Sequence, residues 1–160
     1  MKKVILLSAF LLGAMILKAQ PSTDEINLIQ SAYGMEKRAI VEQAMKLTEA
    51  EAVGFWKIYE DYEVARKEYG KKRVSILVDY ASNYANLTDA KASELVKASM
   101  ANQMTFTKLQ QSTFGKLSKV MSAKRAAQFT QLESYLETVI RLSIADEVPF
   151  INELDDTRKN

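Results

Sequence analysis

The sequence predicts an all-α protein of four helices. Only five glycines and two prolines occur among 160 residues, while Ala, Leu, Lys, Glu and Gln, which favour helices, are abundant. Apolar residues recur every three or four positions over long stretches. Three stretches also begin with the residue types that start helices. Because the predicted helices are long, we expect an elongated arrangement of helical hairpins.

The first 19 residues have the pattern of a secretory signal peptide. Lys2 and Lys3 precede an apolar run over residues 4–17, and Ala19 offers a cleavage point. A membrane-spanning helix needs ~20 apolar residues, and this run is shorter. We therefore expect that the protein is exported, that the leader is removed and that the mature chain has no membrane span. Of the 22 basic residues, three lie in this leader, which leaves 19 against 20 acidic ones. The mature chain therefore has a net charge of −1 and no basic excess that would favour nucleic acid.

Four helices follow from the apolar spacing and the start signals. The first begins after Ser22 or Thr23, and its apolar stripe runs through Ile26, Ile29, Tyr33, Ile40, Ala44 and Leu47. The others are expected over residues 49–86, 89–120 and 123–144, with ends uncertain by ~2 to 4 residues. The fourth carries a seam of Phe129, Leu132, Leu136, Val139 and Ser143, widened by Leu142 and Ile144. We expect one domain over residues 20–145 and a loosely ordered acidic tail over residues 146–160.

Three of these helices share one starting pattern. An apolar residue, a hydroxyl residue and, three places later, a long polar residue recur as Leu47, Thr48, Glu51; Leu87, Thr88, Lys91; and Met121, Ser122, Arg125. The hydroxyl caps a free backbone N–H of the first turn, and Glu51 can close a capping box. The apolar residue before the cap packs onto the core as a staple.

Repeated Leu-Thr-x-x-polar starts in an exported, all-helical chain resemble the LTxxQ family of Gram-negative envelope proteins. That family includes Spy-type ATP-independent chaperones and their stress-sensing relatives. The stretch LTEAEAVGFWKIYEDY is similar to a variant whose first motif is followed by Phe-Trp and spaced tyrosines. The resemblance covers residues 46–137, and the family glutamine is Glu51, Lys91 or Arg125 here. It implies a periplasmic protein of the envelope stress response that works without nucleotide.

The second predicted helix carries a stripe of aromatic residues and arginines. At 100° per residue, one sector holds Phe55, Tyr59, Tyr62, Arg66, Tyr69, Arg73, Ile76, Tyr80 and Tyr84. This stripe either packs against other helices or contacts another polypeptide, because Tyr and Arg suit both environments. An unbroken helix over residues 49–86 is ~57 Å long, whereas a compact globule of this size is ~37 Å across. Unless the helix bends at Gly70, we therefore expect an elongated homodimer.

The chain has neither histidine nor cysteine, so it lacks the commonest general base, the thiol nucleophile and the preferred ligands of zinc. We expect no catalytic residues, no cofactor and no metal site. The prediction is a chaperone-like protein that binds unfolded or partly folded polypeptides. The expected contact residues are Phe55, Tyr59, Tyr62, Arg66, Tyr69, Arg73 and Tyr80, with Met100 and Met104 from the third helix. Two alternatives are a regulatory partner of a membrane stress sensor and a small all-α enzyme such as a secreted chorismate mutase.

Overall fold

The computed structural model describes residues 23–149 and residue 151. Over these residues the chain forms four α-helices, which confirms the all-α prediction. Their bounds are α2 Thr23–Met45, α3 Glu49–Asn83, α4 Asp89–Leu117 and α5 Ala123–Glu147, and a 3₁₀ helix, η1 Tyr84–Asn86, continues α3. The predicted signal peptide and most of the predicted tail lie outside the described residues.

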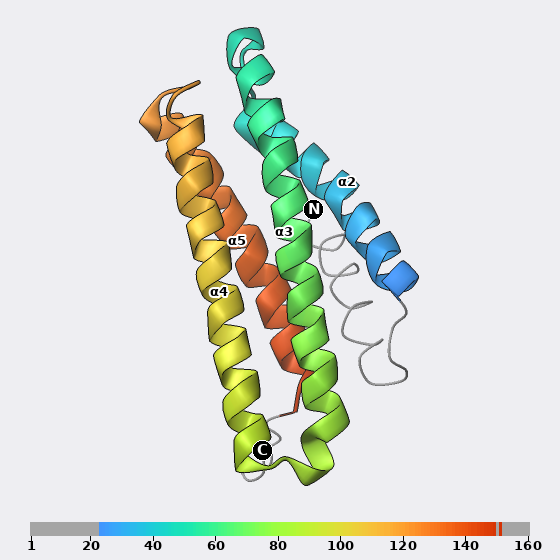
Figure 1. The fold of residues 1–160 in the computed structure, drawn as a ribbon. Coiled ribbons are helices and arrows are strands. Elements are labelled where there is room, and N and C mark those ends of the chain that lie inside the picture. Colours follow the sequence, from blue (N-terminus) through green and yellow to red (C-terminus); the bar gives the residue numbers. More distant parts are fainter. Residues whose placement is uncertain (1–22, 150, 152–160) are drawn as a thin grey trace.

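Successive helices run in opposite directions (Figure 1). α3, α4 and α5 lie along one another, and α2 crosses them at a wider angle. α3 is unbroken through Gly70 and, with 35 residues, is ~52 Å long. Because α4 and α5 accompany it over most of this length, α3 packs its aromatic face within one chain, and its length does not by itself require a second subunit.

The core lies between all four helices and is rich in aromatic rings. Phe129 of α5 meets Phe55, Tyr59 and Tyr62 of α3 edge to face, with ring centroids 5.3, 6.1 and 5.7 Å away. Farther along α3, Tyr69 stacks on Phe106 of α4 at 4.5 Å. These contacts show that the aromatic stripe of α3 is a packing face over most of its length.

Two predicted apolar stripes differ from those observed. The face that α2 buries runs through Lys37, Val41 and Met45, whereas Ala44 is exposed. In α5, Leu142 is 62% exposed, while the seam takes in two glutamates. In both helices charged side chains occupy core positions that an apolar pattern cannot reveal.

The three helix starts are confirmed as capping structures. The side chains of Thr48, Thr88 and Ser122 each accept a hydrogen bond from the backbone N–H three residues on. At α3 the capping box is complete, because the backbone N–H of Thr48 donates to Glu51. Leu47 and Met121 pack against the core, as a staple requires.

The polar residue three places after the cap differs at each start, and each of them joins its helix to another, since Lys91 of α4 also pairs with Asp79 of α3 at 2.8 Å. Arg125 donates from Nε to Glu51 Oε1 at 3.2 Å and from Nη2 to the carbonyl of Met45 at 2.5 Å. Hydrogen bonds from Arg125 and from the backbone of Thr48 hold the pKa of Glu51 below its usual value. The recurrent motif is therefore a helix-starting device whose first and third copies also tie α2, α3 and α5 together, and whose second copy ties α4 to α3.

Candidate functional site

A column of buried polar groups runs between α3 and α5. Tyr62 Oη donates to Glu133 Oε2 at 2.6 Å, and two turns farther Tyr69 Oη donates to Glu137 Oε1 at 2.9 Å. Glu133 and Glu137 are one α-helical turn apart on α5, and Arg141 follows at the same spacing. At two levels of the column, a phenol from α3 thus pairs with a carboxylate from α5.

The upper part of the column is a neutral cluster of four charges. Lys37 of α2 is 1% exposed and pairs with Glu63 and with Glu133, the latter at 2.7 Å. Its ammonium also lies over the Tyr62 ring, 4.9 Å from the centroid. Arg66 donates to both oxygens of Glu63, at 2.9 and 3.0 Å. Two cations and two carboxylates therefore balance one another inside the core.

Burial and pairing act differently on the two carboxylates. Burial raises the pKa of Glu133 above its usual value despite the contact with Lys37. Burial also acts to raise the pKa of Glu63, but Lys37 and Arg66 together hold it below its usual value. Among the described residues Glu133 Oε1 has no hydrogen-bond partner, and the void beside it has no room for a water molecule. Because no ligand can reach it, we assign this cluster a structural role.

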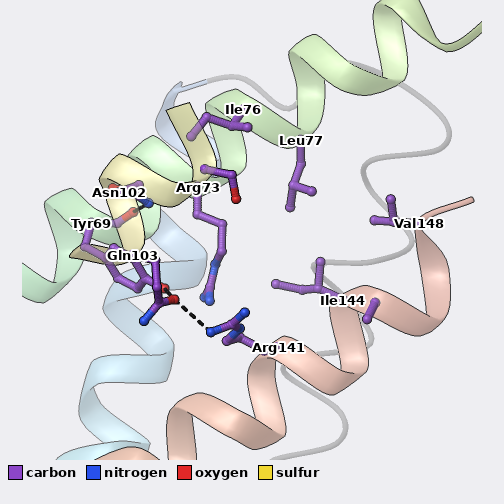
Figure 2. Close-up of a pocket in the computed structure, with 11 residues that line it drawn as sticks. Tyr69, Arg73, Ile76, Leu77, Asn102, Gln103, Arg141, Ile144 and Val148 are labelled. Carbon is purple, nitrogen blue, oxygen red and sulfur yellow. Dashed lines mark hydrogen bonds between the residues drawn. The ribbon is translucent and has the colours of Figure 1, made fainter. Parts of the chain in front are cut away.

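The lower end of the column opens into a pocket of about 290 Å³ between α3, α4 and α5 (Figure 2). One end of the pocket is polar, with Tyr69, Arg73, Ser99, Asn102, Gln103 and Arg141. The other end is mostly apolar, with Ile76, Leu77, Ile144, Ala145 and Val148. In Figure 2, Tyr69, Asn102 and Gln103 lie at one end of the pocket, and Leu77, Ile144 and Val148 lie at the other.

Hydrogen bonds fix most of the polar end. Arg73 pairs with Glu137 at 2.5 Å, and its guanidinium lies 5.2 Å from the centroid of the Tyr69 ring. Arg141 donates to Gln103 Oε1 at 2.7 Å. Burial raises the pKa of Tyr69 to about 12, so the phenol is uncharged at neutral pH. Two arginines and one glutamate leave this end with a net charge of +1.

The predicted contact residues fall into three environments. Phe55, Tyr59, Tyr62, Arg66 and Tyr69 are buried, Arg73 and Tyr80 are half-buried, and Met100 and Met104 are 62% and 59% exposed. A partner could reach Tyr69 and Arg73 only through the pocket. Contact with the other buried members of the stripe would require the helices to separate.

Sequence reasoning missed the side chains that α5 and α4 bring to the column and the pocket. Glu133, Glu137 and Arg141 repeat at four-residue spacing on the face that also carries Phe129. Charged residues that share a helix face with a core aromatic residue are the sequence pattern that could have indicated a buried polar column. For Gln103 the sequence offered no comparable signal.

The fold and the pocket define a class, an all-helical protein with a binding pocket that is cationic at one end and apolar at the other. No family model, no curated protein and no solved structure matches the chain. Within residues 23–149 we find no helix with the length and apolar content that crossing a bilayer requires. The same part of the chain contains no group of three or more acidic side chains placed to hold a metal ion.

Proposed function

We propose that this chain is an exported, chaperone-like protein that binds unfolded polypeptides reversibly and without nucleotide. The observation that carries the proposal is an exposed apolar face on α4, here called the methionine face. It consists of Val96, Met100 and Met104, which are 50%, 62% and 59% exposed. Four-residue spacing places all three on one side of the helix.

The chemistry of the methionine face suits variable partners. Methionine is unbranched and polarisable, so it adapts to apolar segments of different shape. The hydrogen bond from Arg141 to Gln103 brings this part of α4 against α5, where Leu142 is also 62% exposed. Several exposed apolar side chains on one helix face are typical of a protein-binding surface. The pocket opens beside it, since Ser99 and Gln103 line the pocket.

An aggregation assay with matched variants tests the proposal. We expect the wild-type protein to slow the aggregation of a denaturant-unfolded enzyme, and Met100→Ser with Met104→Ser to lose most of that protection. The control is Val53→Ser with Val64→Ser, which removes two residues that are 82% and 68% exposed on the outer side of α3. All variants should keep their helical circular dichroism, because every substituted side chain is exposed.

The outcomes separate the functions considered above. Equal loss of protection in both double variants would mean that general surface hydrophobicity, and not the methionine face, is responsible. If the wild-type protein gives no protection but retains one folded envelope protein in a pull-down, it is the regulatory partner of a sensor and the chaperone proposal is wrong.

A further inference from the structure

The polar end of the pocket has two arginines and one carboxylate, so one positive charge is not neutralised. Glu137 pairs with Arg73, whereas Arg141 forms no ion pair with the residues that the structure describes. Nε of Arg73 is buried and has no hydrogen-bond partner among these residues. Arg141 is exposed and donates one hydrogen bond to Gln103, so its guanidinium group has capacity for a further acceptor.

The opposite end offers an apolar wall instead of further charge. Leu77 of α3 faces Ile144 and Val148 of α5 across the cavity (Figure 2), and Ile76 also lines it. Ile144 is buried, at 5% exposed, while Ile76, Leu77 and Val148 are half-buried, so a ligand would cover apolar surface that still meets water. A ligand that fills the pocket therefore has to be anionic at one end and apolar at the other.

We propose that this pocket binds a monocarboxylate that carries a short apolar chain. A guanidinium group matches a carboxylate with two parallel hydrogen bonds, and one excess positive charge balances a monoanion. A phosphate dianion would carry more negative charge than the site neutralises, and it has no apolar group to contact the apolar wall. The volume of about 290 Å³ lies at the small end of ligand pockets, which typically measure ~300 to 1,000 Å³.

Such a carboxylate has two sources, a free medium-chain acid or the C-terminus of a peptide that ends in an apolar residue. The inference does not depend on the chaperone proposal, because a free acid would bind whether or not polypeptides do. A peptide C-terminus would connect the pocket to clients on the neighbouring methionine face.

Calorimetric titration of the full chain tests the proposal with defined probes. Octanoate represents the free acid, and a tripeptide ending in leucine represents the peptide source. Their uncharged counterparts are octanol and the same tripeptide with an amidated C-terminus. We expect saturable one-site binding of at least one carboxylate, about tenfold tighter than its uncharged counterpart, since hydrogen bonds to a charged acceptor are stronger than those to a neutral one. The carboxylate that binds identifies the source.

Substitutions locate the binding and control for charge. Arg141→Gln should weaken binding about tenfold without affecting the fold, because this side chain is exposed and loses only one hydrogen bond to an amide. Lys108→Gln, which removes the same charge from an exposed position on α4, should bind within twofold of the wild type. Leu77→Ser should weaken the binding of octanoate more than that of acetate, because it removes an apolar side chain from the wall of the pocket.

Several results would overturn the proposal. These are the absence of saturable binding by either carboxylate, binding of octanol or inorganic phosphate as tight as that of octanoate, and unchanged affinity in Arg141→Gln. Failure of octanoate alone, with the leucine peptide still bound through Arg141, assigns the site to polypeptide C-termini. The aggregation assay is independent of all these outcomes, so the two proposals can fail separately.

Discussion

Replacing Lys37 with methionine removes the cation that holds two carboxylates together inside the bundle. Lys37 is 1% exposed and contacts Glu63, Glu133 and the rings of two tyrosines. In the variant, Glu63 keeps Arg66, but Glu133 keeps only the Tyr62 hydroxyl. Breaking a buried pair in this way costs ~3 to 5 kcal/mol, a large share of a total stability of ~5 to 15 kcal/mol. The melting temperature should fall by roughly 10 to 20 °C.

The stability of Lys37→Met should also depend on pH in a specific direction. Burial already raises the pKa of Glu133, and removal of the neighbouring cation raises it further. A carboxyl group whose folded pKa is raised destabilises the fold as pH rises above its unfolded value of ~4.3. The deficit relative to the wild type should therefore be smallest in acid and grow toward neutral pH. Adding Glu133→Gln to Lys37→Met should recover part of the loss, because a neutral amide can still accept the Tyr62 hydrogen bond.

Urea unfolding at several pH values measures both effects. The single tryptophan, Trp56, contacts the ring of Phe55 at 5.1 Å and reports on the same core by fluorescence. The reasoning would be refuted if Lys37→Met stayed within 1 kcal/mol of the wild type at every pH, since that would show that Glu133 tolerates burial without its cation. A loss that is the same at all pH values would show that packing and not charge is responsible.

The remaining predictions concern packing. Gly54→Ala should destabilise the fold by ~1 to 3 kcal/mol, because an added Cβ would lie 2.9 Å from Cβ of Val120. Gly115→Ala, whose added Cβ would meet no atom of the described part of the chain within 4 Å, should instead stabilise it by up to ~1 kcal/mol, and equal effects in thermal melts would contradict this difference. Tyr62→Ser with Tyr69→Ser should cost more than ~5 kcal/mol and abolish cooperative melting, because both rings are buried. A folded double variant would show that these rings are not core.

The helix starts could be predicted because they depend on local chemistry. A hydroxyl side chain that accepts from a backbone N–H three residues away uses atoms within one turn, so Thr48, Thr88 and Ser122 were identifiable without tertiary information. The helix ends were less certain. α5 continues to Glu147, three residues beyond the end predicted from the sequence. The prediction ended too early because Asp146 and Glu147 are charged and do not extend the apolar pattern.

The buried charges and the pocket could not be predicted in the same way. Whether a lysine is buried depends on whether other helices supply carboxylates at its position, and for Lys37 these come from α3 and α5. The apolar period of the first helix therefore placed Ala44 on the buried face in place of its neighbour Met45. Similarly, Arg73 and Arg141 belong to different helices, so only the packing of α3 against α5 shows that they share a cavity.

The charge sequence along the column explains why the cavity lies at its lower end. Isolated charges are expensive to bury, so a sealed column has to be balanced at every level. At the upper level Lys37 and Arg66 meet Glu63 and Glu133, and the helices close around a neutral set. One turn after Glu137 the residue on α5 is Arg141, so the next level has two cations and one carboxylate. Such a level is stable only where water or an anion reaches it, and this is where the three helices leave a pocket.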